Sequence, residues 1–185
     1  EAGAKDRGSI VRRAAKAVAD ARKEDTGPIR LVTTGDTKVA GRISALQADL
    51  RNALAKGEIE ILFQPQFAIA SGRIDGVEAL ARWQHPKYGL IGAKTLFTVA
   101  EQSDYLVELS AHIQRRALEL AAAWPTSLSR LRLSVNVTAR DIKHPGFAQR
   151  FLARVESCGF ARTRLTVEVT ETGLMEDLDV SAKVL

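Results

Sequence analysis

Cysteine and aromatic residues are scarce in this sequence. Its 185 residues include one cysteine, Cys158, and aromatic residues make up 5% of the chain. A single cysteine excludes a disulfide within the chain and a zinc site built from cysteines. Chains without disulfides are typical of the cytoplasm, which is therefore the expected compartment.

Long apolar runs are missing as well. No run approaches the roughly 18 apolar residues of a membrane-spanning helix, so we expect no membrane contact by this segment. The chain begins EAGAKDRG, with neither an initiator methionine nor a signal-peptide pattern. We therefore interpret it as an excerpt of a longer protein, whose sensor or membrane segments would lie elsewhere.

Clusters of like charge are the third missing feature. The net charge is +5, but the basic residues are scattered, so a nucleic acid polymer is not an expected partner. Hydrophobic residues make up 45% and charged residues 26% of the chain, as in ordinary globular proteins. The length suffices for one domain and part of another.

The first third of the chain reads as two helices around a linker. Helical spacing of apolar residues predicts a helix that ends near Gly27, followed by a short strand at residues 28–34. Residues 33–38, TTGDTK, are predicted to form a turn-rich linker, and we place a domain boundary there. A second amphipathic helix is predicted from Val39, Ile43, Leu46, Leu50 and Leu54.

From residue 58 onward, predicted strands alternate with predicted helices. The strands cover residues 58–67, 72–83, 130–138 and 164–172. The helices cover residues 94–103 and 106–124, a stretch around 147–155, and a final segment after residue 172. The apolar face expected for the helix at 106–124 consists of Leu106, Leu109, Ile113, Ala117, Leu120 and Ala121. This alternation predicts an α/β sheet or barrel.

Each predicted strand carries an apolar stripe on one face and polar groups late on the other. Side chains alternate between the two faces of a strand, which places Glu78, Asn136 and Glu168 opposite the apolar stripes. A half-solvated antiparallel sheet would show the same pattern. The intervening helices instead favour parallel strands, whose second face would point into a closed barrel.

Carboxylates inside a barrel need partners, because an unpaired buried charge is costly. Glu78, Asn136 and Glu168 would then share a cation, since carboxylate and amide oxygens are the ligands that Mg²⁺, Mn²⁺ and Ca²⁺ prefer. Late strand positions are also where barrel enzymes carry their catalytic residues.

Four segments together resemble a known family. FQPQF, VEALARWQHP, SVNVTARD and VEVTET occur in the order and approximate spacing of the EAL domain, a family of bacterial phosphodiesterases that act on cyclic di-GMP. The resemblance assigns residues 36–185 to the N-terminal half of an EAL domain. Residues 1–35 resemble the C-terminal end of a GGDEF domain, followed by a linker. The implied fold is a modified TIM-type (β/α)₈ barrel with an antiparallel first strand, of which this chain supplies the first half.

The resemblance also implies roles for individual residues. Glu78, Asn136 and Glu168 are expected to bind metal, with Glu78 as a catalytic residue. Two divalent ions, Mg²⁺ or Mn²⁺, are expected in the complete site. The residues expected to contact the dinucleotide are Gln64, Leu80 and Arg82. Glu171 is expected to hold a mobile loop over the site and to link it to dimerisation, so the expected partners are cyclic di-GMP and a second EAL domain in a homodimer.

The implied activity is hydrolysis of cyclic di-GMP to linear pGpG in second-messenger signalling. The alternative is a degenerate EAL domain that acts as a cyclic di-GMP receptor or a signalling scaffold. The three intact ligands favour the enzyme. The family's DDFG motif and its later lysine, glutamate and glutamine are absent from these residues, so the 185 residues alone are expected to be inactive.

Overall fold

The computed structural model describes residues 34–169, with side chains from residue 41 onward. The chain divides into two compact units, Glu1–Ala48 and Asp49–Leu185. In the first unit the described part is the beginning of helix α2 (Thr34–Ala55). The elements predicted before residue 34 and the helix predicted after residue 172 lie outside the described residues. Among the helices that are described, none has both the length and the apolarity needed to cross a membrane.

Helix α2 begins inside the segment that was predicted to be a linker. The turn predicted at residues 33–38 is wrong from Thr34 onward, because the helix begins there. Gly35 and Asp36 are therefore part of the helix, which tolerates the glycine because a glycine costs only about 1 kcal/mol there relative to alanine. The helix ends at Ala55, and Gly57, with φ at +70°, turns the chain toward the sheet.

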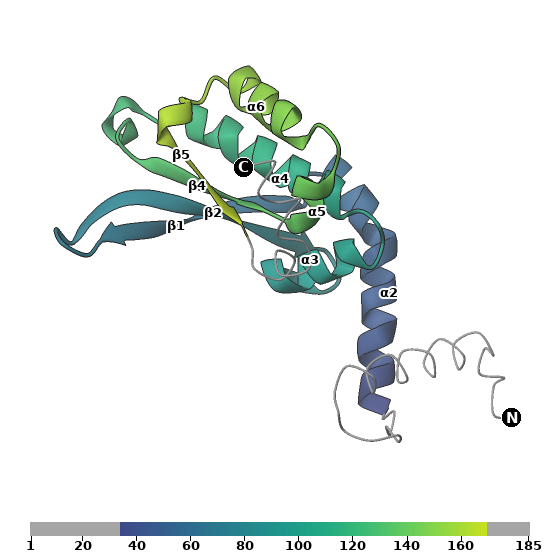
Figure 1. The fold of residues 1–185 in the computed structure, drawn as a ribbon. Coiled ribbons are helices and arrows are strands. Elements are labelled where there is room, and N and C mark those ends of the chain that lie inside the picture. Colours follow the sequence, from purple (N-terminus) through teal and green to yellow (C-terminus); the bar gives the residue numbers. More distant parts are fainter. Residues whose placement is uncertain (1–33, 170–185) are drawn as a thin grey trace, which may run out of the picture. The chain divides into compact units, whose positions relative to one another are not determined.

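One mixed sheet forms the centre of the second unit (Figure 1). Strands β1 (Ile59–Ala68) and β2 (Arg73–His85) form an antiparallel hairpin. Strand β4 (Arg132–Val137) is parallel to β2, and β5 (Leu165–Val169) is parallel to β4. The spatial order is β1-β2-β4-β5. The short strand β3 (Gly89–Gly92), which pattern reasoning missed, pairs with the end of β2.

Helices connect the parallel strands, as parallel pairing requires. Helices α3 (Ala93–Glu101) and α4 (Leu106–Ala122) lead from β2 to β4. Helices α5 (Ala139–Lys143) and α6 (Phe147–Ser157) lead from β4 to β5. Two 3₁₀ turns, Thr126–Leu128 and Arg162–Arg164, precede β4 and β5. The structure therefore confirms the α/β class, and it adds α5 to the predicted elements.

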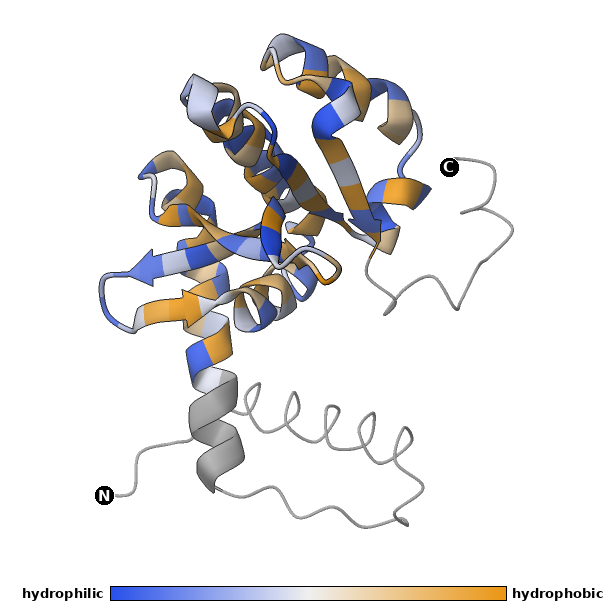
Figure 2. Ribbon diagram, turned by 90° about the vertical axis from the view of Figure 1, so that its left-hand side faces the viewer, coloured by the Kyte–Doolittle hydropathy of each residue, from blue (hydrophilic) through white to orange (hydrophobic). Residues whose placement is uncertain are grey.

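The apolar stripes of the strands lie on one face of the sheet, against helices such as α4, which packs on β4 and β1. We call this the helix-covered face; its buried residues in β2 and β4 are Val77, Ala79, Ala81, Trp83, Leu133, Val135 and Val137. Figure 2 shows hydrophobic and hydrophilic residues interleaved along strands and helices. Because β2, β4 and β5 are parallel, the antiparallel alternative is wrong for these strands.

The buried face of α4 differs from the predicted one. Leu118 is fully buried, whereas Leu120 is half-buried and lines a cavity together with residues of β1. The difference arises because two polar residues, Ser110 and Gln114, also lie on the buried face of α4. A hydrophobicity pattern places polar residues on the solvent side, so it rotates the predicted face away from them.

Candidate active site

The second face of the sheet carries the polar residues singled out in the sequence. We call it the open face; its residues are Gln64 and Gln66 of β1, Glu78, Leu80 and Arg82 of β2, Ser134 and Asn136 of β4, and Thr166 and Glu168 of β5. Gln64 is paired in register with Glu78, and Asn136 with Glu168. Side chains of residues paired in this way point to the same side of a sheet.

Asn136 lies between two carboxylate-bearing strands. Its amide Nδ2 donates a hydrogen bond to Oε1 of Glu78, at 2.8 Å. On its other side, Asn136 is the register partner of Glu168 in the neighbouring strand β5. All three side chains are half-buried. The structure thus brings Glu78 and Asn136 into contact and places Glu168 on the same face, while their role as ligands stays a prediction.

Each of these side chains keeps an oxygen that a cation could use. Within residues 34–169, no hydrogen bond reaches Oε2 of Glu78, Oδ1 of Asn136 or Oε2 of Glu168. Such oxygens are of the kind that Mg²⁺ and Mn²⁺ prefer. The same stretch contains no group of three or more His, Cys, Asp or Glu side chains that could hold a metal ion. The two carboxylates and one amide therefore fit the expected ions in the kind of oxygen that they offer.

The backbone of Asn136 is held from the helix-covered side. Gln114 of α4, which is 1% exposed, donates from Nε2 to the carbonyl oxygen of Asn136 at 3.3 Å. Arg154 of α6 in turn donates to Oε1 of Gln114, at 2.5 Å. Burial lowers the pKa of Arg154, and the charge of Arg115 lowers it further. Two helices thus fix the end of β4 where Asn136 lies.

The chain leaves β4 through a tight polar cap. Thr138 caps helix α5, and its hydroxyl accepts a hydrogen bond from the backbone N–H of Asp141. Oδ2 of the buried Asp141 accepts from the Thr138 backbone N–H and hydroxyl, both at 2.8 Å, and from the Ser110 hydroxyl at 2.6 Å. This reciprocal capping box fixes the chain two residues after Asn136.

The residues expected to bind the dinucleotide lie along β1 and β2. Gln64 is exposed, whereas Leu80 and Arg82 are half-buried. The guanidinium of Arg82 donates to the carbonyl oxygen of Ala81 at 2.8 Å. All three share the open face with Glu78, so the structure groups them, and their substrate contacts stay predictions. Glu171 lies outside the described residues.

Strand parity places Gln66 and Ser134 on the open face, but sequence reasoning gave these two residues no role. The amide of Gln66 donates from Nε2 to Oε1 of Glu168, at 3.0 Å. The hydroxyl of Ser134 donates to Oε1 of Gln66, at 3.2 Å. Both residues have the same strand parity as the predicted site residues, which was the available signal. A cavity of about 230 Å³ lies beside them and is lined by Gly76, Arg132 and Thr166 among others.

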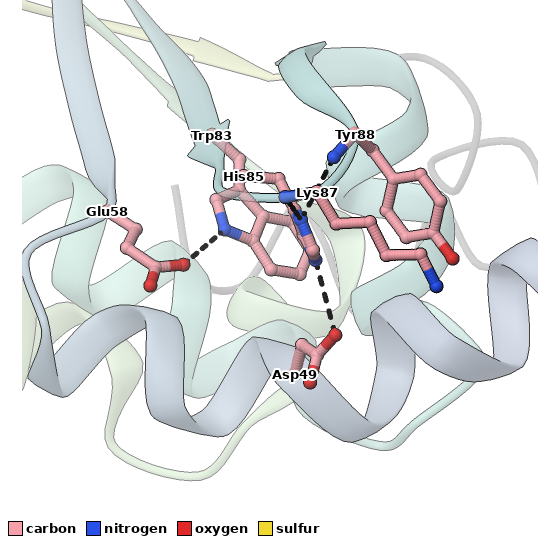
Figure 3. A network of polar contacts seen from close by, with 6 residues as sticks. All are labelled: Asp49, Glu58, Trp83, His85, Lys87 and Tyr88. Carbon is pink, nitrogen blue, oxygen red and sulfur yellow. Dashed lines mark hydrogen bonds and ion pairs between the residues drawn. The ribbon is translucent and has the colours of Figure 1, made fainter.

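A second polar cluster lies near the end of β2 and involves a buried histidine (Figure 3). Nδ1 of His85 accepts hydrogen bonds from the backbone N–H groups of Lys87 and Tyr88, at 3.1 and 3.3 Å. Its Nε2 lies 3.3 Å from Oδ2 of Asp49. Because both ring nitrogens are engaged within the fold, we assign His85 to the structure of this turn and not to catalysis.

The fold agrees with comparisons to known proteins. The EAL domain family model matches residues 47–185. A cyclic di-GMP phosphodiesterase of Pseudomonas aeruginosa, NbdA, is 32% identical over 141 residues, which are 76% of this chain and 18% of that protein. Another from the same organism, PA2567, is 30% identical over 145 residues, 78% of this chain and 25% of that protein.

A solved structure of the PaMucR phosphodiesterase in complex with c-di-GMP is similar in fold. It is 29% identical, with a TM-score of 0.70, over 76% of this chain and 57% of that one. The chain spans less than a fifth of the length of the first curated relatives that it matches, between 16% and 18%. Since the family model covers most of the chain and the solved structure shares its strands and helices, the chain belongs to the EAL domain family.

Proposed function

We propose that this chain belongs to a metal-dependent phosphodiesterase that hydrolyses cyclic di-GMP to linear pGpG. One observation carries the proposal: Glu78, Asn136 and Glu168 lie on one face of three adjoining parallel strands, and each keeps an oxygen without a hydrogen-bond partner in the described residues. Two relatives, NbdA and PA2567, are named as cyclic di-GMP phosphodiesterases. Completion of the site requires residues beyond those described.

The proposed metal site uses Glu78, Asn136 and Glu168 to hold Mg²⁺ or Mn²⁺, with two ions in the complete site. Bound there, the ions would supply an activated water and charge stabilisation for the attacking and leaving oxygens of a phosphodiester. The residues of this chain orient the ligands: the hydrogen bond from Asn136 fixes one oxygen of Glu78, and Gln114 fixes the backbone of Asn136.

Arg82, Gln64 and Leu80 are proposed to bind the dinucleotide. A guanidinium pairs well with phosphate oxygens because its planar N–H groups match their geometry. Arg82 lies four residues beyond Glu78 on the same face of β2, about 13 Å along the strand, so a ligand as long as a dinucleotide could contact both side chains. The amide of Gln64 offers hydrogen bonds, and Leu80 offers an apolar surface for a guanine base.

One observation favours a second function, that of a non-catalytic cyclic di-GMP receptor or scaffold. Residues 34–169 contain no group of three or more acidic, histidine or cysteine side chains arranged to hold a metal. If the rest of the protein supplied no further ligands, the open face would bind the dinucleotide through Arg82, Gln64 and Leu80 without cleaving it.

Product analysis separates the two functions. The full-length protein is incubated with cyclic di-GMP and Mn²⁺ or Mg²⁺, and products are resolved by chromatography. The enzyme yields pGpG, and a chelator such as EDTA abolishes its formation. Cyclic di-GMP that binds in calorimetry but stays intact would overturn the phosphodiesterase and support the receptor.

Further parts of the proposal concern the remainder of the chain and its assembly. We propose that residues 1–35 are the end of a GGDEF domain, that the protein forms a homodimer through its EAL domain, and that Glu171 couples its site to that dimer. A cytoplasmic location stays a prediction from the single cysteine. Light scattering of the full-length protein, with and without cyclic di-GMP, measures the oligomeric state; a monomer under both conditions would contradict the dimer.

A further inference from the structure

Gln66 has no role in the proposed chemistry so far, yet its side chain forms the hydrogen bond of the open face whose two residues are farthest apart in sequence. It begins on β1, and its amide reaches Glu168 on β5, 102 residues later in the sequence. The amide oxygen of Gln66 also accepts a hydrogen bond from the hydroxyl of Ser134 on β4. The side chain therefore spans the sheet from β1 across β2 to the two parallel strands beyond it.

Gly76 makes this crossing possible. It is the register partner of Gln66 in β2, and it has no side chain to block the path. A Cβ atom at this position would lie 3.3 Å from Oε1 of Gln66 and 3.0 Å from the carbonyl oxygen of Arg132. Both distances are tighter than ordinary contacts, so the local packing depends on the missing side chain.

Ser134 sets the direction of the amide. Because its hydroxyl donates to Oε1 of Gln66, the NH₂ end of the amide is turned toward Glu168. Ser134 is 2% exposed and Gln66 is half-buried, so little water competes for these bonds. The contact occupies Oε1 of Glu168, and Oε2 is the oxygen without a partner in the described part of the chain.

We propose that Gln66 is a positioning residue that orients the carboxylate of Glu168 for metal binding, with Ser134 holding its amide in the donating direction. The inference rests on the proposed function, since it assigns a purpose to a contact with an expected ligand. Hydrogen-bond partners behind metal ligands restrict the orientation of the ligand, and their loss typically weakens metal affinity about 10- to 100-fold.

The test compares two glutamines that make the same kind of contact. Gln66→Met removes the donor to Glu168 while keeping the size of the side chain. Gln84→Met is the matched control, because the exposed Gln84 also donates to a carboxylate across β1 and β2, that of Glu60, at 3.1 Å. Mn²⁺ binding to the full-length protein is measured from the electron paramagnetic resonance signal of the free ion.

Gln66→Met is expected to raise the Mn²⁺ dissociation constant about 10-fold, and Gln84→Met to leave it unchanged. Ser134→Ala is expected to produce a smaller rise in the same direction. The Mn²⁺ concentration that half-saturates hydrolysis should rise in parallel, with most of the rate recovered at saturating Mn²⁺. A purely structural role would instead lower the melting temperature without changing the Mn²⁺ affinity of the folded protein.

The outcomes separate this inference from the proposed function. If the parent protein binds Mn²⁺ and Gln66→Met binds it equally well or more tightly, the positioning role is overturned and the phosphodiesterase proposal stands. Tighter binding would show that Gln66 competes with the ion for Glu168. A parent protein that binds no Mn²⁺ would overturn both proposals.

Discussion

The carboxylates on the two sides of the sheet differ in the number of hydrogen bonds that they accept. Among the helices on the covered side, Oδ2 of Asp141 in α5 accepts three hydrogen bonds, from Ser110 and Thr138. On the open face, the described part of the chain gives Glu78 and Glu168 one hydrogen bond each. The fold thus supplies the first carboxylate with three hydrogen bonds, whereas the other two accept one each and keep more capacity to bind a ligand.

The contrast gives a physical criterion for telling structural from functional carboxylates. A buried polar group without partners costs free energy, so folds satisfy such groups unless a ligand completes them. Asp141 is 3% exposed and accepts three hydrogen bonds from the fold, all of them at Oδ2. Glu78 and Glu168 are half-buried and accept one hydrogen bond each from the described residues.

The largest effect is expected on the open face, from Glu78→Gln. The change removes a proposed ligand but keeps the size of the side chain, and the loss of metal-assisted stabilisation should lower the rate on the order of a thousandfold. The melting temperature without metal should change little. Hydrolysis of cyclic di-GMP and thermal unfolding are measured on the same preparation; a substantially active variant would contradict the assignment of Glu78.

The reverse pattern is expected on the helix-covered face. Leu133, which is fully buried, lies on β4 next to a residue of the open face, Ser134. Leu133→Ala should lower the free energy of unfolding by about 3 kcal/mol, through lost burial and the cavity left behind. Urea denaturation measures the loss, with Leu152→Ala as the control, because Leu152 is 43% exposed on α6. Equal losses in the two variants would show that this face is not the core.

Asp141→Ala tests the carboxylate that accepts three hydrogen bonds. The change leaves the Ser110 and Thr138 donors without their acceptor and removes the Asp141 half of the capping box of α5, at a cost of about 2 kcal/mol. Because Thr138 follows Asn136 closely, we also expect a weaker Mn²⁺ affinity, by a smaller factor than in Gln66→Met. Urea denaturation and the Mn²⁺ titration measure the two effects; an unchanged stability would contradict the structural role of Asp141.

The smallest effect is expected from His112 on α4. Burial lowers the pKa of His112, and Arg115 and Arg116 lower it further, while Glu119 raises it. Its pKa in the folded state is therefore below the value of 6.5 in the unfolded chain. The unfolded state binds more protons, so this contribution is present above about pH 6.5 and is lost as the pH falls through the folded-state pKa.

The measurement compares His112→Gln with the parent protein by thermal unfolding at about pH 7.5 and about pH 5.5. The parent should lose more stability on acidification than the variant does. An identical loss in both proteins would show that His112 does not titrate differently on folding.

Much of the site could be predicted because strand parity is local. Glu78, Asn136 and Glu168 each lie directly between two apolar neighbours of opposite parity, and the same alternation runs along each strand. The apolar residues Leu133, Val135 and Val137 are buried as predicted. The motif order supplied the family, which the comparison with the EAL domain model confirms.

The features that the sequence did not predict depend on polar residues at a helix start or on a buried helix face. Helix α5 is short and has no apolar periodicity; its start is defined by the capping box that the N-cap residue Thr138 forms with Asp141. Ser110 and Gln114 lie on the buried face of α4 because each finds a polar partner there. A pattern of hydrophobicity carries no information about such partners.

The sequence by itself determined which face of each strand is apolar and which residues could reach a common site, because alternation along a strand is set by neighbours in the chain. Only the tertiary structure decided that β2, β4 and β5 are adjacent, and that Gln66 crosses Gly76 to reach Glu168. Contacts of this kind join residues far apart in sequence, so they exist only once the order and register of the strands are fixed.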